Sequence, residues 1–308
     1  MTAIDDTPES NDPAPAPDAA PDVDSREAAA AGRKAARRET LRLLMKRPAF
    51  IGGVLIVMIW VVCALFTNLI APYNPLDYRT GLNMSPSWSH PFGTDKGGRD
   101  VLSRVIAGAR DVLKIAPIAA MLGVLGGVIL GLLMGYLRGA FDTVASRVVE
   151  AFLSLPVVLL ALLAITTLGN SNWVVIGVVA TLFTPVVART VRSAVLAERE
   201  LDYVTSARLR GESSLFVMYR EILPNISGPI IVELTVRIGY AVFTVATLSF
   251  LGAGPPPPSP DWGAQVSDNY NSIVAGYWWS TFFPAAAIAS LVIAVNLIAD
   301  SIERVVKS

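Results

Sequence analysis

The chain has 308 residues, of which 53% are hydrophobic and only 16% are charged. Soluble domains carry about 25% charged residues, so this composition excludes a protein whose whole surface faces water. The formal net charge is zero, and one cysteine and one histidine exclude a disulfide framework, a Cys/His metal cluster and most histidine-dependent catalysis. The hydrophobic residues occur in blocks that approach the roughly 20 residues needed to cross a bilayer, which indicates an all-α polytopic membrane protein.

The start of the chain is polar and changes the sign of its charge. Residues 1–32 are rich in Asp, Pro and Ala and carry almost no large apolar side chains, so we expect a disordered acidic cytoplasmic tail and no signal peptide. Residues 33–49 predict a basic interfacial elbow before the first span, with an apolar side that includes Leu41 and Leu44. The basic residues of this elbow are Arg33, Lys34, Arg37, Arg38, Arg42, Lys46 and Arg47.

Residues 50–308 are predicted to form the transmembrane domain, with six membrane-spanning helices. Their approximate ranges are 50–71, 115–137, 148–168, 173–191, 228–251 and 282–299. Six spans place both termini on the same side of the membrane. Most Lys and Arg residues outside the spans fall on that side, which the positive-inside rule assigns to the cytoplasm. The basic residues of the opposite side all lie between residues 72 and 114.

The loop before the second span is rich in turn residues, and it contains His90, which we interpret as a loop residue and not as a ligand. Apolar residues recur at helical spacing over residues 101–113, and this pattern predicts an amphipathic surface helix that leads into the second span. Gly97 and Gly98 follow Lys96, but the spacing of a phosphate-binding loop is absent and no strand precedes them.

The second span carries a strip of glycines on one helix face. Gly123, Gly127, Gly131 and Gly135 are each four residues apart, and such small residues let two helix backbones approach closely. The strip is either a packing face inside one helix bundle or a contact face for a partner subunit.

Charged residues within the spans are few. Glu233 and Arg237 lie four apart near the start of the fifth span, where we favour a structural ion pair over a substrate relay. No series of carboxylates crosses the predicted membrane region, which argues against an ion-coupled secondary carrier. No Ser/His or paired-Asp constellation lies within the spans, which argues against an intramembrane enzyme.

The longest cytoplasmic loop, residues 198–225, predicts a helix, a glycine break, a second helix and an exit marked by proline. Its small residues Ser206, Ala207 and Gly211 would let a second protein approach the backbone. The composition suits a docking element, although a simple connecting loop could share it.

This loop resembles the coupling loop of bacterial ABC importer permeases, whose pattern is Glu-Ala-Ala, three residues, Gly, nine residues and Ile-x-Leu-Pro. Ala207, Gly211, Leu223 and Pro224 fall at the matching spacing, whereas Thr205, Ser206 and Glu221 depart from the pattern. Two further segments resemble the C-type permeases of dipeptide, oligopeptide and nickel importers. They are Phe92-Gly93-Thr94-Asp95 with Gly98–Arg104, and Leu248–Gly252 with Asp261-Trp262-Gly263.

The resemblance implies a type I importer permease of the bacterial inner membrane that forms half of a translocation pore beside a B-type permease. Two ATP-binding subunits would dock on its cytoplasmic loops, and an extracytoplasmic binding protein would deliver di- or oligopeptides, with nickel chelates, heme or glycans as alternative cargoes. ATP and Mg would be bound by the partner subunits, because the chain has no Walker A motif. It would therefore have no cofactor, metal, nucleic-acid partner or enzymatic activity of its own. The residues expected to couple it to the ATPase are Tyr203, Ser206, Ala207, Arg208, Gly211, Leu223 and Pro224.

Overall fold

The computed structural model describes residue 39 and residues 41–78, 81–256 and 258–306, and it divides into residues 1–43 and residues 44–308. The predicted acidic tail, residues 1–32, lies outside the described residues, as do residues 33–38 and 40 of the predicted elbow. The rest of the elbow contains a short helical stretch over residues 41–44, and Arg47 directly precedes the first long helix as its N-cap.

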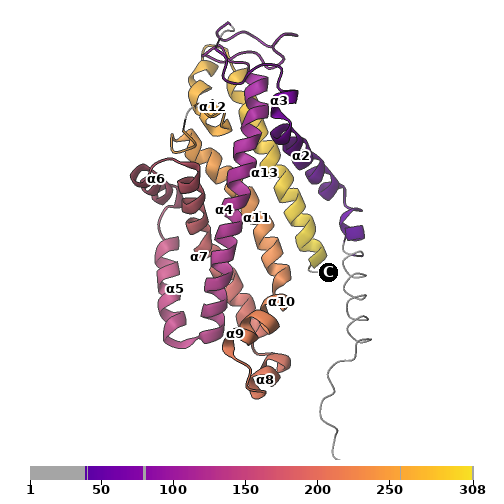
Figure 1. Cartoon of the computed structure of the whole chain (residues 1–308), viewed down its shortest axis with the longest axis vertical. Coiled ribbons are helices and arrows are strands. Elements are labelled where there is room, and N and C mark those ends of the chain that lie inside the picture. The colour runs from indigo at the N-terminus through magenta and orange to yellow at the C-terminus, as the bar shows by residue number, and fades with distance from the viewer. Residues whose placement is uncertain (1–38, 40, 79–80, 257, 307–308) are drawn as a thin grey trace, which may run out of the picture. The chain divides into compact units, whose positions relative to one another are not determined.

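Among its described residues, the unit 44–308 consists of helices and loops, with one isolated β-bridge between Thr94 and Asp100. The long helices are α2 (Pro48–Leu65), α4 (Val101–Leu137), α7 (Asn172–Glu198), α11 (Ser227–Phe250) and α13 (Trp279–Val306). The shorter ones are α3 (Thr67–Ile70), α5 (Gly139–Leu153), α6 (Val157–Leu168), α8 (Asp202–Leu209), α9 (Ser214–Phe216), η1 (Val217–Ile222), α10 (Leu223–Asn225), α12 (Trp262–Asn269) and η2 (Tyr270–Ile273). Figure 1 shows α8 and α9 at one end of this unit and α12 at the other.

Five described helices are long and apolar enough to cross a membrane, and the pair α5 and α6 raises the number to six if it counts as one span. This agrees with the predicted six-span fold except at the third span, residues 148–168, which we expected to be one continuous helix. Instead, α5 and α6 meet at an angle of 88°. Pro156 explains the break, because its nitrogen has no hydrogen to donate to the carbonyl of Phe152 and its ring disfavours a helical conformation at Leu155.

The predicted amphipathic surface helix over residues 101–113 is the first part of α4, and it is not at the surface. Val105, Ala109 and Val112 are buried in the main core. The helix begins at the Asp100 carboxylate, which accepts hydrogen bonds from the backbone N–H (2.8 Å) and the hydroxyl (2.7 Å) of Ser103. Trp262, at the start of α12, then covers this part of α4. The apolar face was read correctly, but its partner is protein and not lipid.

The glycine strip of α4 faces α7. A Cβ atom at Gly123 would lie 2.9 Å from the Ala180 carbonyl oxygen, and one at Gly131 would lie 2.7 Å from that of Ala188. At Gly135 the added atom would lie 2.7 Å from Val195 Cβ, and at Gly127 it would overlap Val187. No L side chain larger than hydrogen fits at these separations unless the helices move apart. A helix of the same chain therefore occupies the strip, and this distinguishes between the two alternatives that the sequence left open.

The loop before α4 folds into a compact cap at the α12 end of the unit. The Trp279 indole donates a hydrogen bond to the Thr94 carbonyl (3.0 Å), and His90 Nδ1 lies 2.9 Å from Asp100 Oδ1 in a buried pair. Gly93 has a φ of +71°, and a Cβ atom there would lie 2.7 Å from the Trp279 ring. Both the turn and the close approach therefore require glycine at this position. His90 is a structural residue of this cap.

Candidate functional site

Residues 202–225 form a folded segment at the end of the unit opposite α12 (Figure 1). Helix α8 ends in a Schellman motif, in which the Gly211 amide donates to the Arg208 carbonyl (3.0 Å) and the Glu212 amide donates to the Ala207 carbonyl (3.2 Å). Gly211 has a φ of +79°, a conformation that side chains with a Cβ atom disfavour. The predicted glycine break is thus the C-terminal cap of α8.

The second helical part of the segment contains a π-helix. Helix α9 begins where the Ser213 hydroxyl accepts a hydrogen bond from the Phe216 amide (3.3 Å), and it continues as η1 and then α10. Pro224 has no N–H to donate to the Arg220 carbonyl four residues earlier, and the Leu223 amide bonds five residues back to Met218. Pro224 is exposed and Leu223 is half-buried. Short π-helices of this kind occur frequently at functional sites.

The inner face of the segment packs against α7. Val204 and Ala207 of α8 and Val217 and Ile222 of η1 are fully buried, in a cluster that also contains Val195. We expected the small side chain of Ala207 to lie at a docking surface, and this expectation is wrong. The small side chain of Ala207 lets α8 pack closely in this cluster. Ala207 can therefore influence a docked subunit only indirectly, by setting the shape of the segment.

Tyr203 joins the beginning and the end of the segment. Its hydroxyl donates to Glu198 Oε1 (2.7 Å) at the end of α7 and accepts from Asn225 Nδ2 (3.0 Å) in α10. Burial and the hydrogen bond to Glu198 together raise the pKa of Tyr203 to about 12, so the hydroxyl keeps its proton at physiological pH. Tyr203 therefore acts within the chain, as a link that holds the segment closed.

The outer face of the segment exposes apolar residues among charged ones. Leu209 is 85% exposed and Leu215 is 62% exposed, and Ser206, Arg210 and Gly211 are exposed near them. The two leucines give this otherwise polar face apolar side chains that a second protein could cover. Arg208 is exposed too, but its guanidinium lies over the ring of Tyr136 at 5.0 Å, at the end of α4.

Glu233 and Arg237 are brought together on α11. Arg237 Nη2 lies 2.9 Å from Glu233 Oε1, and both side chains are less than 15% exposed. The guanidinium also lies 5.9 Å from the Phe183 ring centroid on α7 and 5.2 Å from that of Tyr240. The pair thus places two opposite charges that neutralise each other between α11 and α7.

Two basic residues that the sequence did not single out tie the helices of this end together. Arg192 of α7 forms two hydrogen bonds to the Asp142 carboxylate of α5, of 2.6 and 2.7 Å. Arg199 donates to the carbonyls of Gly135 (3.2 Å) and Tyr136 (2.9 Å), which end α4 without helical partners. A sequence offers little sign of such contacts, because the partners lie 50 or more positions apart.

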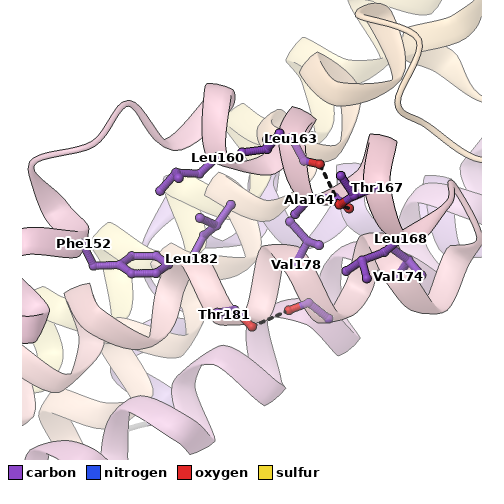
Figure 2. Close-up of a pocket in the computed structure, with 11 residues that line it drawn as sticks. Phe152, Leu160, Leu163, Ala164, Thr167, Leu168, Val174, Val178, Thr181 and Leu182 are labelled. Carbon is purple, nitrogen blue, oxygen red and sulfur yellow. Dashed lines mark hydrogen bonds between the residues drawn. The ribbon is translucent and has the colours of Figure 1, made fainter.

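An apolar cavity of about 720 Å³ lies between α6 and α7 (Figure 2). Its polar side chains are used locally, since the Thr167 hydroxyl donates to the Leu163 carbonyl (2.9 Å) and the Thr181 hydroxyl donates to that of Gly177 (2.8 Å). The cavity offers hydrocarbon surface and no charged group. Within the described residues, no group of three or more His, Cys, Asp or Glu side chains could hold a metal ion.

One protein family and several known permeases are similar to this chain. The family of binding-protein-dependent transport system inner membrane components matches residues 127–308. A Brucella suis protein provisionally named a peptide transport system permease is 38% identical and covers 86% of this chain and 90% of its own length. The Di/tripeptide transport system permease protein DppC of Pseudomonas aeruginosa is 36% identical, covering 82% of this chain and 85% of its own length.

Two further similarities concern a glutathione permease and a solved structure. The Glutathione transport system permease protein GsiD of Escherichia coli is 38% identical and covers 80% of this chain and 82% of its own length. Among solved structures, a chain of the inward-facing MetNI methionine ABC transporter aligns with a TM-score of 0.54 over 66% of this chain and 96% of its own length. At 20% sequence identity this match supports the fold alone.

Proposed function

Since this chain belongs to the family of binding-protein-dependent transport system inner membrane components, we propose that it forms half of the pore of an ATP-driven importer for short peptides. The chain is an ABC importer permease of the inner membrane, and it is not itself catalytic. Family membership implies that a binding protein and an ATPase work with it. No cofactor is expected in a chain of this family.

The peptide cargo is supported by the relatives. One bears the name of a di/tripeptide permease and another that of a glutathione permease, at 36% and 38% identity. Glutathione is itself a tripeptide, so both names describe short peptides with free carboxylates. Short peptides are therefore the cargo that we propose for this chain.

The partners that we propose are a B-type permease, which completes the pore, and two ATP-binding subunits. The observation that carries the ATPase contact is the fold of residues 202–225. This segment is fixed to α7 by its buried face and by Tyr203, while Leu209 and Leu215 remain exposed. A segment that is fixed to its own chain and exposes leucines on its outer face can pass a movement of a docked subunit into the helices.

We further propose that both termini and the segment 202–225 lie in the cytoplasm and that the α12 end lies outside. The distribution of Lys and Arg supports this orientation, because most of them flank the termini and the segment. The cap before α4 also carries basic residues, but Arg104 is buried and Arg99 is partly buried there, both close to Asp95, so they contribute little free positive charge.

Reconstitution tests the cargo. The chain, its B-type partner and the two ATP-binding subunits are placed in vesicles with the loaded binding protein, and uptake of a labelled dipeptide, a tripeptide, a nickel–histidine complex, heme and a glycan is compared. We expect ATP-dependent uptake of the peptides only. Uptake of another cargo, with none of either peptide, would contradict the peptide assignment and leave the importer intact.

A further inference from the structure

A second, polar cavity lies at the α12 end of the unit, far from the segment 202–225. It has a volume of about 260 Å³ and lies between the start of α4, the loop that follows α11, and α12. Its lining includes two arginines, Arg99 and Arg104, together with the hydroxyl-bearing residues Ser249 and Ser267. Unlike the apolar cavity between α6 and α7, it offers charged and hydroxyl groups to a ligand.

Arg104 is buried at this cavity with its Nε donor unused. Its side chain is 2% exposed, and its Nε finds no hydrogen-bond acceptor among the described residues. The nearest carboxylate oxygen, Asp95 Oδ2, is 3.7 Å away, beyond hydrogen-bonding distance. Nη1 makes a long contact of 3.4 Å to the Pro75 carbonyl. A guanidinium has five N–H donors, and a buried one normally satisfies them with a carboxylate or carbonyls.

The neighbouring charges are already committed to Arg99. Asp95 accepts from Arg99 Nε (2.7 Å), and its other oxygen accepts from the Gly97 and Arg99 amides. Asp268, which is 48% exposed, lies 3.7 Å from Arg99 Nη2. Asp95 and Asp268, of which Asp268 lines the cavity, therefore lie closest to Arg99. Arg104 keeps an unpartnered Nε donor.

Ser249 provides a second unused group. It is 3% exposed, and Ser249 Oγ and the neighbouring Asp261 Oδ2 are both left without a hydrogen-bond partner among the described residues. A buried hydroxyl and a buried guanidinium Nε that are unpartnered and belong to residues lining one cavity indicate a site that lacks an acceptor. An acceptor with two oxygens matches the planar fork of an arginine.

We propose that this cavity binds a carboxylate, which accepts hydrogen bonds from Arg104 and from the Ser249 hydroxyl. The volume is below the range of about 300–1,000 Å³ that holds whole small-molecule ligands, so the cavity takes one terminal residue or one acidic side chain and not an entire peptide. Two sources can supply such a group from the α12 end: the C-terminal carboxylate of a transported peptide, or an Asp or Glu side chain of the binding protein. The choice between these two sources rests on the proposed importer function. The binding of a carboxylate to the cavity does not, and can be tested separately.

The site itself can be tested without transport. The purified permease complex is heated in detergent with N-acetylalanine, with N-acetylalanine amide, or with chloride at equal ionic strength. The carboxylate should raise the melting temperature, and the neutral amide and chloride should not. Arg104→Gln should weaken the apparent affinity for N-acetylalanine, read from the concentration that raises the melting temperature, by about tenfold or more, because charge-assisted hydrogen bonds are lost.

Two further variants test the site even if Arg104→Gln destabilises the protein. Ser249→Ala removes a hydroxyl that has no partner, so it should leave the unliganded melting temperature unchanged and reduce the carboxylate effect. Ser267→Phe fills the cavity from α12 and should abolish the effect. An equal response to the acid and the amide, or a carboxylate effect that survives both Ser267→Phe and Arg104→Gln, would overturn the proposal.

Transport then identifies the source of the carboxylate. If the cargo supplies it, Arg104→Gln raises the KM for a dipeptide acid but not for the dipeptide amide, and docking of the binding protein is unchanged. If the binding protein supplies it, docking weakens and uptake of both cargo forms falls together. A wild-type complex that transports no peptide would contradict the proposed function, whereas its thermal response to N-acetylalanine would still test the site.

Discussion

The indole nitrogen of Trp262 lies 2.7 Å from the Val105 carbonyl oxygen, to which it donates a buried hydrogen bond across 157 positions of the sequence. The same indole leaves no room beside the next turn of α4. A Cβ atom at Gly108 would lie 2.5 Å from Trp262 Cδ1 and 2.5 Å from the Pro260 carbonyl oxygen. The contact between α4 and the loop before α12 therefore depends on the absence of a side chain at Gly108.

Gly108→Ala should destabilise the protein by about 1–3 kcal/mol, because the added methyl group must displace the Trp262 ring or the backbone at Pro260. The melting temperature of the purified chain in detergent measures the effect. Gly52→Ala is the matched control, since Gly52 is also helical and a Cβ atom there would meet nothing within 4 Å. A Gly108→Ala chain as stable as the control would show that the ring can move freely.

Substitutions at Gly211 can separate backbone strain from added bulk. The φ of +79° penalises Ala and Leu by about 1–2 kcal/mol, whereas Asn tolerates this conformation. A Cβ atom at Gly211 would meet nothing in the chain within 4 Å, so bulk alone costs the isolated protein little. We expect Gly211→Ala and Gly211→Leu to lower the melting temperature and Gly211→Asn to change it little.

In the assembled complex the order should differ. If Gly211 lies at the ATPase contact, Gly211→Leu and Gly211→Asn should both reduce binding-protein-stimulated ATP hydrolysis, and Gly211→Ala should reduce it less. Full stimulation by Gly211→Leu at normal expression would mean that the residue is only a helix cap.

The ion pair on α11 should show strong coupling. Glu233→Gln leaves Arg237 without its 2.9 Å partner between two helices, and Arg237→Gln does the converse. Each single change leaves one charge uncompensated and should destabilise the protein, and Glu233→Gln with Arg237→Gln together should be less destabilising than the sum of the two single changes. The measurement is a double-mutant cycle of melting temperatures for the wild type, the two single variants and the double variant. Strict additivity would show that the two side chains act independently.

Asp261 should give the protein a pH-dependent stability. Burial raises the pKa of Asp261 from 3.8 to about 6, against the opposing effect of the Ala264 amide, which donates a hydrogen bond of 2.9 Å to Oδ1. Because the folded state binds this proton more tightly than the unfolded state, the contribution to stability is fully present below about pH 4 and is lost as the pH rises through about 6. Its size is roughly 3 kcal/mol, from about two pKa units.

Asp261→Asn keeps an acceptor for the Ala264 amide but cannot ionise. Relative to wild type, it should therefore melt higher at pH 7.5 and show no advantage at pH 4. Asp300→Asn, at an exposed carboxylate near the end of α13, is the control and should follow wild type at both pH values. A constant difference between the Asp261→Asn and wild-type proteins from pH 4 to 7.5 would contradict the assignment.

Cysteine labelling tests the proposed orientation. In a Cys63→Ser background, Val274→Cys is at a residue that is 94% exposed next to η2, and Leu209→Cys is at one that is 85% exposed on α8. An impermeant thiol reagent added to intact cells should label the former and not the latter. Permeabilised cells should show both labels, which controls for access, and the reverse pattern in intact cells would invert the topology.

The sequence was sufficient for the features that depend on composition and local spacing. Hydrophobic length located the five long helices, and the four-residue spacing placed Glu233 beside Arg237. The spacing also put the four glycines on one face of α4, but the identity of the facing helix required the fold. Gly211 and Pro224 were identified as interruptions because glycine readily adopts the positive φ that ends a helix and proline has no N–H to donate.

Features that depend on distant parts of the chain were missed. The 88° bend between α5 and α6 follows from Pro156, but hydrophobicity runs through it without a change. Ala207 resembled an exposed docking residue because nothing in α8 alone shows that η1 folds back over it. The cavity at Arg104 is formed by segments from four regions of the sequence, so no local pattern could have indicated it.

The glycine contacts between α4 and α7 have a mechanical consequence. With 37 residues, α4 is about 55 Å long at 1.5 Å per residue, and α7 lies so close to it from Gly123 to Gly135 that a Cβ atom at any of the four glycines would collide with α7. Helices packed this closely are expected to move together as one unit, with the segment 202–225 at one end and the Arg104 cavity at the other. A tilt of such a unit by about 5° about its middle would carry each end through about 2 Å, so a short displacement of the segment 202–225 would reach the Arg104 cavity undiminished.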